Sequence, residues 1–441
     1  GTLVAIYNAC IYGGSVTAVL INVPGTPGSA ATCADGFAMS QKGEAGKALG
    51  ISIMASAFGG LASALALLFL APIIARFALM FGPAEYFWLA CWGLTIIAAV
   101  TGKKVFLKGL IATTIGFTLA MIGIDSVTGQ ARYIFGLLDL YDGLDMLALV
   151  IGAFAVSQVL TMANEGGSIS KVGKLTGKVM QGLWVPFRHW VTLLKSTVIG
   201  IVFGAIPAVG MSAASFFSYS EAVRSSKNPE KFGKGAIEGV AAPESANNAS
   251  AGASLIPLLS LGIPPNPIMA IFFSALIIHG IQPGPLLIKQ HPDLFWGLVA
   301  SLYLGNGLLL VLNLPLIGIW VKVLEIPYKI LFPLILLFCL IGVYSMNNLS
   351  FDLYVMLFFG VVGWLMRKFG YEGAPLILAY VLGPMLENAL RQSLLISQGS
   401  FLIFVTRPIS AVALGFAFLL LLTTLLPNFK KRRQQYDQFK E

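Results

Sequence analysis

The sequence is poor in charged residues. Only 11% of its 441 residues are Asp, Glu, Lys or Arg, whereas 57% are hydrophobic. Soluble globular proteins carry about 25% charged residues, so a water-soluble domain of this length could not cover its surface with so few. A surface that faces lipid needs no such cover, because apolar side chains match the acyl chains. The composition therefore predicts a membrane protein and excludes an ordinary soluble one.

Residues that commonly bind metals or act as nucleophiles are also scarce. The chain has 4 cysteines and 3 histidines, and neither set shows metal-ligand spacing. No hydrolytic triad is recognisable. The sequence contains no Gly-x4-Gly-Lys-Ser/Thr motif, so the chain does not itself use ATP to drive a process. We therefore expect neither an enzyme nor a bound cofactor.

Long apolar runs are abundant. Runs of roughly 18 residues or more are long enough to cross a ~30 Å hydrocarbon core as helices. They are continuous and lack the alternation of membrane β-strands, which favours an all-α polytopic integral membrane protein. A further apolar segment, rich in small residues, covers 1–21. The predicted spans lie at 47–75, 86–101, 106–124, 144–162, 191–206, 294–321, 329–346, 351–367, 373–391 and 401–427.

The net charge of +9 is distributed unevenly. A polar stretch over 163–190 is basic, and a basic C-terminal tail over 430–441 follows the last apolar run. Clusters of Lys and Arg beside membrane spans are typical of cytoplasmic loops. We therefore place both segments on the cytoplasmic side, and expect membrane lipid and no nucleic acid as a partner.

Three regions interrupt the apolar pattern with proline and glycine. They cover 22–32, 204–215 and 243–267. Proline removes a backbone donor and disfavours helix in the preceding residue, so such segments leave backbone groups that lipid cannot satisfy. They must be buried in protein or line a wet cavity. We predict discontinuous helices, broken or re-entrant, at these motifs.

The chain also repeats itself weakly. The motif Pro24-x-x-Pro27 matches Pro264-x-x-Pro267 at an offset of 240 residues. Chance similarity between Gly-rich apolar segments is the alternative explanation. Internal repeats with broken helices in corresponding places are typical of secondary transporters. We predict a first repeat over 1–162, which lacks its opening segment, and a second repeat over 191–429.

A broken helix offers two kinds of binding site. The N-terminus of its second half presents free N–H groups that suit carboxylates, and the unwound carbonyls suit a cation. Packing between membrane helices is the alternative role for each small polar residue near a break. The candidate substrate ligands are Asn22, Thr26, Ser29, Thr32, Ser212, Ser215, Asn247, Asn248 and Asn266. The candidates for coupling to an ion are Pro24, Gly25, Glu244 and Pro264.

Acidic residues at membrane depth are costly and indicate function. Glu244 lies in the polar patch beside a predicted break, for which an interfacial loop is the alternative. Asp125 and Glu372 follow apolar spans. We interpret these two as helix-end acids in water and not as ion ligands.

Four long motifs resemble the large membrane subunit, of the TctA type, of tripartite tricarboxylate transporters. They cover 12–32, 35–50, 231–248 and 380–397, and the resemblance extends over essentially the whole chain. It implies a multi-pass permease of the bacterial inner (cytoplasmic) membrane, which works with a small four-span membrane subunit and a periplasmic solute-binding protein. It also implies import of organic carboxylates, coupled to a gradient of Na⁺ or H⁺.

The sequence departs from the pattern of that family at one loop. Relatives usually read Gly-Ile-Pro-Gly-Ser-Ala where this chain reads Gly-Ile-Pro-Pro-Asn-Pro over 262–267. The extra proline stiffens the tip of the loop, which leaves the specificity for tricarboxylates open. An uncoupled channel or facilitator for small organic anions is the alternative function.

Overall fold

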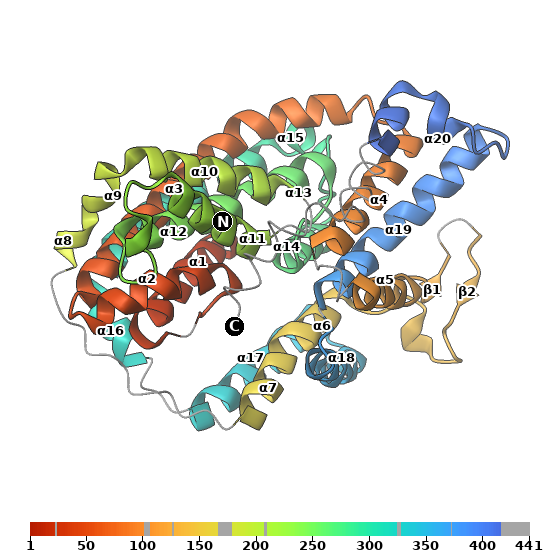
Figure 1. Cartoon of the computed structure of the whole chain (residues 1–441). Coiled ribbons are helices and arrows are strands. Elements are labelled where there is room, and N and C mark those ends of the chain that lie inside the picture. Colours follow the sequence, from red (N-terminus) through yellow and green to blue (C-terminus); the bar gives the residue numbers. More distant parts are fainter. Residues whose placement is uncertain are drawn as a thin grey trace. The chain divides into compact units, whose positions relative to one another are not determined.

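The computed structural model describes residues 1–22, 24–100, 106–125, 128–165, 179–206, 210–323, 328–371 and 373–415. The chain forms two compact units. Unit 1 contains Gly1–Leu79 and Ala155–Asn348, and unit 2 contains Met80–Phe154 and Leu349–Glu441. Figure 1 shows that the described chain is almost entirely helical. Each unit combines segments of both predicted repeats, and the repeats themselves stay a prediction.

Unit 1 is built from helices alone in its described part. They are α1 (Thr2–Ile21), η1 (Pro27–Ser29), α2 (Ala30–Gln41), α3 (Ala45–Ala78), α7 (Ser157–Glu165), α8 (Met180–Leu183), α9 (Val185–Arg188), α10 (Trp190–Ala205), α11 (Gly210–Ser225), η4 (Pro229–Lys231), α12 (Ile237–Ala253), α13 (Leu255–Leu261), α14 (Pro267–Ile278), α15 (Leu287–Gln290), α16 (Pro292–Val323) and α17 (Tyr328–Asn347).

Unit 2 adds a short antiparallel hairpin to its helices. Its elements are α4 (Pro83–Val100), α5 (Phe106–Ala120), β1 (Gly123–Ile124), β2 (Ala131–Arg132), η2 (Leu138–Leu140), α6 (Met146–Ile151), α18 (Ser350–Lys368), α19 (Gly373–Ile396) and α20 (Ile403–Thr406). A π-helical stretch, η3 (Gly152–Val156), follows α6 along the chain and leads into α7.

Several helices are long and apolar enough to cross a membrane. Among the described residues five meet this criterion, and shorter apolar helices such as Trp190–Ala205 and Pro267–Ile278 accompany them. The five cover Thr2–Leu20, Ala45–Ala78, Pro292–Ile319, Ser350–Lys368 and Gly373–Ile396. The prediction of an all-α membrane protein is confirmed at this level. The predicted span over 401–427 and the basic loop over 163–190 lie partly outside the described residues. The basic tail over 430–441 and Glu372 lie wholly outside them.

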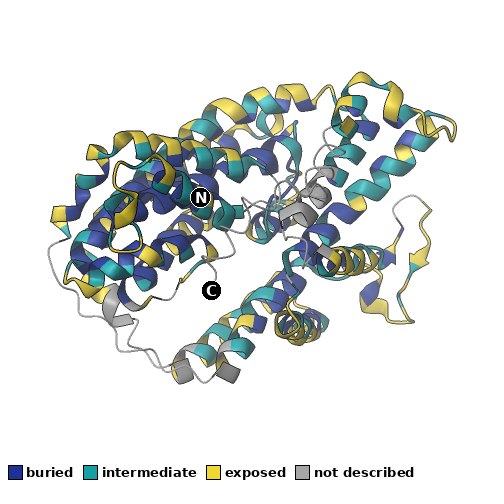
Figure 2. Cartoon of the chain, viewed as in Figure 1, coloured by how far each residue is buried: buried dark blue, intermediate teal, exposed yellow. Residues whose placement is uncertain are grey.

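Helix α12 lies in the middle of unit 1, where it contacts α3, α10, α11, α2 and α1 (Figure 1). Every residue from Gly239 to Ala253 is buried, and buried residues gather on this helix and the faces around it (Figure 2). Its sequence consists largely of Ala, Gly, Ser and Asn. Such small residues let membrane helices approach closely. A core of this kind tolerates polar side chains only where other helices satisfy them.

Glycines on the neighbouring helices permit the close approach to α12. A Cβ built on Gly59 of α3 would lie 2.2 Å from the Ser245 carbonyl oxygen. On α10, a Cβ on Gly200 would lie 2.4 Å from the Ala246 carbonyl oxygen. Both distances are far below van der Waals contact, so any side chain there would push the helices apart.

The first part of the predicted break over 243–267 is wrong. The segment from Pro243 to Asn248 lies inside α12 and does not interrupt it. Proline removes a single N–H, and hydroxyls on a neighbouring helix can bind carbonyls near such a position. Here Ser218 Oγ donates to the Ala242 carbonyl over 2.9 Å, and Ser215 Oγ to the Pro243 carbonyl over 3.3 Å.

At the other Pro/Gly motifs one helix ends and the next begins. Helix α1 ends at Ile21 and is followed by the left-handed Asn22, with φ of 56°. Helix α13 ends before Gly262, with φ of 73°, and α14 begins at Pro267. Helix α10 ends at Ala205 and α11 begins at Gly210, while 207–209 lie outside the described residues. That these ends are halves of broken membrane helices stays a prediction.

Candidate functional site

The carboxyl group of Glu244 lies in the interior of unit 1, and the residue has no exposed surface. Thr32 Oγ1 on α2 donates a hydrogen bond to its Oε1 over 2.5 Å. Ser56 Oγ on α3 donates to its Oε2 over 3.1 Å. None of the ion pairs in the described part of the chain includes Glu244. Within the described structure, hydroxyl groups from two other helices and no positive charge bind this carboxyl group. Because Glu244 is buried inside a helix, the interfacial-loop alternative is wrong.

A series of hydroxyls continues from this carboxyl group to α1. Ser52 Oγ on α3 donates to Ser15 Oγ over 2.7 Å, and Ser15 Oγ donates to the Tyr12 carbonyl over 2.7 Å. Ser52 lies one helical turn before Ser56 on the same helix, α3. The hydroxyl of Tyr12 is buried and has no hydrogen-bond partner among the described residues. Helices α2 and α3 thus both donate hydroxyls to the carboxyl group of α12, and a hydroxyl pair connects α3 with α1.

Asn247 follows Glu244 on α12 by about one helical turn. Its amide is buried, and neither Oδ1 nor Nδ2 has a partner among the described residues. A Cβ built on Gly28 would lie 2.0 Å from Asn247 Oδ1, so the amide lies against the turn before α2, where only glycine fits. Most buried polar atoms are hydrogen-bonded. An amide with both atoms unpaired therefore marks a place for a ligand or for water.

Asn248, the next residue, is only partly satisfied. Its Nδ2 donates to the Glu244 carbonyl over 3.2 Å, whereas its Oδ1 is buried without a partner in the described structure. Asn8 Nδ2 on α1 and Asn306 Oδ1 on α16 are likewise buried without a partner among the described residues. The sequence analysis did not select Asn8 or Asn306. The interior of unit 1 therefore contains several buried side-chain N and O atoms that form no hydrogen bond with another described residue.

The turn between α1 and α2 is stabilised by its own side chains. Thr26 N–H donates to Ser29 Oγ over 3.2 Å, as in a capping box. Ser29 Oγ also donates to the Thr26 carbonyl over 2.8 Å. Gly25 N–H donates to the Gly14 carbonyl of α1 over 3.2 Å. Pro24 and Gly25 are exposed, whereas Ser29 is buried. Thr26 and Ser29 therefore shape the turn that faces Asn247.

The other candidates have different surroundings. Asn266 caps α14, because its Oδ1 accepts a hydrogen bond from Met269 N–H over 3.0 Å. The buried Pro264 lies in the loop before this cap, and Ser215 binds the carbonyls of Met211 and Pro243. No hydrogen bond in the described structure connects these side chains with Glu244 or its hydroxyls. The last two candidates are exposed or half-buried, namely Asn22 and Ser212.

Sequence reasoning missed Asp35 as a residue of this region. This α2 residue is fully buried, and its Oδ1 accepts hydrogen bonds from the N–H groups of Gly235 and Ala236, both over 2.7 Å. Its Oδ2 accepts from Tyr219 Oη over 2.8 Å. Burial and the Asp35 carboxylate raise the pKa of Tyr219, which keeps that hydroxyl a donor. Asp35 therefore fixes the start of α12 against α2.

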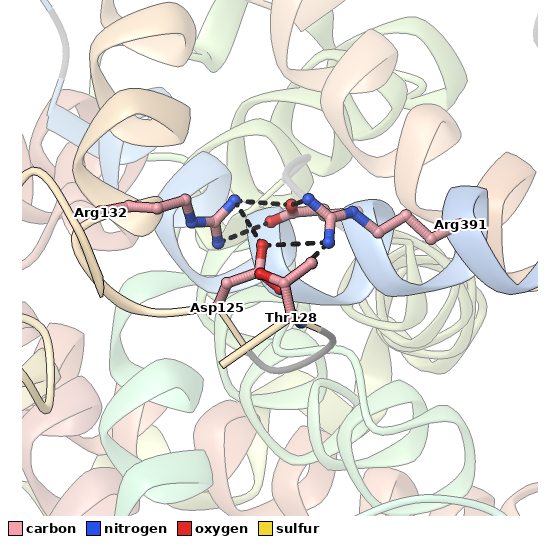
Figure 3. Close-up of polar contacts among 5 residues, drawn as sticks. Asp125, Thr128, Arg132 and Arg391 are labelled. Carbon is pink, nitrogen blue, oxygen red and sulfur yellow. Dashed lines mark hydrogen bonds and ion pairs between the residues drawn. The ribbon is translucent and has the colours of Figure 1, made fainter. Parts of the chain in front are cut away.

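Unit 2 holds a second polar cluster, drawn in Figure 3, which overturns the interpretation of Asp125 as an acid in water. Asp125 is 3% exposed. Its Oδ2 lies 3.0 Å from Arg391 and 3.2 Å from Arg132, and Glu387 lies 2.8 Å from Arg132 and 2.7 Å from Arg391. Two carboxylates and two guanidinium groups balance in charge. The cluster attaches the β1–β2 hairpin to α19.

A chain with several apolar spans, and with a carboxyl group and unpaired amides in the interior of one unit, is a polytopic membrane protein with a polar core. Its sequence matches the model of the family described as "Tripartite tricarboxylate transporter TctA family" over residues 1–378. The chain belongs to this family, and it is therefore a multi-pass membrane protein of a transporter family.

Two relatives from Agrobacterium vitis are similar over much of the chain. An "Uncharacterized 52.8 kDa protein in TAR-I ttuC' 3'region" is 44% identical over 437 residues, which cover 98% of this chain and 86% of the relative. An "Uncharacterized protein in TAR-II ttuC' 3'region" is 52% identical over 236 residues, which cover 54% of this chain and 98% of the relative. No solved structure matches the chain.

Proposed function

We propose that the chain is the permease subunit of a binding-protein-dependent secondary transporter, which imports tricarboxylates or related organic carboxylates in response to an ion gradient. Membership of the family supports transport of tricarboxylates. The observation that carries the proposal is the buried amide of Asn247, unpaired at both atoms and set against the turn before α2.

This arrangement suits a carboxylate for two reasons. The first N–H groups of a helix have no acceptor within the helix, and they carry a partial positive charge. The turn over Pro27–Ser29 leads directly into α2, so such groups lie next to the amide. A carboxylate at this position accepts hydrogen bonds from Asn247 Nδ2 and from the backbone of the turn. Thr26 and Ser29 contribute by fixing the shape of that turn.

Glu244 links the site to an ion. A charged carboxylate inside a protein is costly without a counter-charge, so this residue gains from a bound cation or proton. It lies about one helical turn from Asn247, and a positive charge there favours an anionic substrate beside it. Na⁺ and H⁺ both meet this requirement. Alternating access then moves one part of the duplicated, broken-helix assembly against another.

The proposed partners follow from the tripartite organisation in the family's description. They are a small four-span membrane subunit and a periplasmic solute-binding protein, which selects the carboxylate before the permease receives it. The location that fits such an assembly is the bacterial inner membrane. An uncoupled channel for organic anions remains the second candidate, and accumulation of substrate above its outside concentration separates the two.

The proposal is tested by uptake of a tricarboxylate into cells that express the complete transporter. Asn247→Leu should lower uptake at least about ten-fold, the loss that corresponds to one hydrogen bond to a charged group. Asn313→Leu is the matched control, because in the described structure the Asn313 amide donates to the Leu309 carbonyl of its own helix and to no other group. Uptake by the Asn247 variant at the level of the control would refute the site.

A further inference from the structure

Glu244 differs from three other buried acids, Asp35, Glu85 and Asp125, in how its charge is compensated. Glu85 lies 2.9 Å from Arg407, and Asp125 lies beside two arginines. Asp35 accepts two backbone N–H groups at the start of α12, where the helix dipole is positive. Glu244 lies in the middle of α12, and among the described residues its carboxyl group receives only hydroxyl donors. Its charge therefore requires a positive partner that the described side chains do not supply.

The hydroxyl groups near this carboxyl group are more numerous than the hydrogen-bond acceptors that a protonated carboxyl group requires. Thr32 Oγ1 and Ser56 Oγ bind its two oxygens. Ser52 lies one helical turn before Ser56 on α3 and donates to Ser15 Oγ on α1. These four hydroxyls come from three different helices. A protonated carboxyl group requires a single acceptor for its proton. A cage of carboxylate and hydroxyl oxygens is instead the ligand set of a hard cation.

We propose that a monovalent metal cation of the Na⁺ type binds to the Glu244 carboxylate and the hydroxyl oxygens of Thr32, Ser56 and Ser52. One carboxylate balances one positive charge, whereas divalent hard cations are commonly held by several carboxylates. The hydroxyls that now donate to the carboxylate turn their lone pairs to the cation when it binds. The buried Tyr12 hydroxyl, which has no partner among the described residues, belongs to α1, the helix of Ser15.

This inference rests on the proposed function, for which it names the coupling ion. Glu244 and Asn247 lie about one turn apart on α12, so the bound cation raises the potential at the position of the substrate carboxylate. Substrate and cation then each bind more tightly in the presence of the other, since such coupling is reciprocal.

The test measures cation binding without transport. The purified full-length protein is heated in detergent in NaCl, KCl or choline chloride of equal ionic strength. The midpoint of unfolding should rise with Na⁺ in a saturable manner, and choline should have no effect, because only a ligand of the folded state stabilises it. Ser56→Ala and Thr32→Val should each weaken the apparent Na⁺ affinity roughly ten-fold or more, and Glu244→Gln should abolish the response.

Ser260→Ala is the matched control, since among the described residues this buried serine donates only to the Ile256 carbonyl of its own helix. It should retain the full response to Na⁺. Identical unfolding in NaCl and choline chloride, or unfolding that responds to pH alone, would overturn the cation site. If Glu244→Gln does not fold, a normal response to Na⁺ in Ser56→Ala and Thr32→Val would also overturn the cation site. Na⁺ binding without carboxylate uptake would instead refute the proposed function and leave the site intact.

Discussion

Thr32 and Glu244 are 212 residues apart in the sequence, yet their side chains share a hydrogen bond of 2.5 Å in the interior of unit 1. This contact joins α2, which follows the first Pro/Gly motif, to the central helix α12. The region that supplies the turn against Asn247 is thus attached directly to the buried carboxyl group. A movement of the turn before α2, or binding of a ligand there, should therefore shift the Glu244 carboxyl group, and the reverse.

Thr32→Val should destabilise the folded protein. The substitution keeps the shape of the side chain but leaves one oxygen of a buried carboxyl group without its donor. Loss of a hydrogen bond to a charged group costs about 1.5–3 kcal/mol. The free energy of unfolding in detergent measures this. Thr161→Val serves as the control, because Thr161 donates only to the Ser157 carbonyl within its own helix. Equal stability of both variants would contradict the contact.

Gly59→Ala should weaken the packing of α3 against α12. The added methyl carbon would lie 2.2 Å from the Ser245 carbonyl oxygen, and overpacking of this kind costs about 1–3 kcal/mol. At Gly307, on α16, a Cβ would meet nothing within 4 Å. Gly307→Ala should therefore be neutral or stabilising by up to about 1 kcal/mol. Thermal unfolding of the two variants checks this, and the opposite order would show that α12 is not closely packed.

Asp35→Asn should loosen the start of α12. An amide can replace only part of the three hydrogen bonds that the carboxylate accepts from Gly235, Ala236 and Tyr219. We expect a loss of about 1–3 kcal/mol and faster hydrogen exchange at the first turn of α12. Tyr219→Phe removes one of the three donors and should have a smaller effect. Unchanged exchange in both variants would mean that Asp35 does not hold this helix.

Asp125→Asn should release the β1–β2 hairpin from α19. Removal of one carboxylate leaves the guanidinium groups of Arg132 and Arg391 with an excess of positive charge. Breaking a fully buried pair costs about 3–5 kcal/mol, and the partial exposure of both arginines reduces this to about 1–2 kcal/mol. Limited proteolysis should cleave the hairpin sooner in this variant. The exposed Asp139 provides the control, and Asp139→Asn should leave cleavage unchanged.

The apolar spans were predictable because a helix that crosses the bilayer needs a long run of apolar residues. Such a run can be recognised in each segment by itself. The predicted spans at 47–75 and 294–321 correspond to α3 and α16, for example. Helix α12 was not predicted as a helix, because it is buried among other helices and lacks a long apolar run, and its small polar residues resemble a loop. Its signal was the density of Ala, Gly and Ser on a segment with a single proline.

Contacts between side chains that lie far apart in the sequence could not be predicted from the sequence. Asp125 was interpreted as an acid in water because its partner Arg391 lies 266 residues further along the chain. Glu244 and Thr32 were both selected, but for different roles, and only the fold shows that they touch. The functions assigned to them stay predictions.

The most direct test of the account is accumulation of a tricarboxylate by the chain together with its membrane subunit and binding protein in proteoliposomes. The substrate should rise above its outside concentration when an inward Na⁺ gradient is imposed, and Glu244→Gln or Asn247→Leu should remove that rise. A substrate concentration that only equilibrates across the membrane, with or without the gradient and in all variants alike, would contradict it.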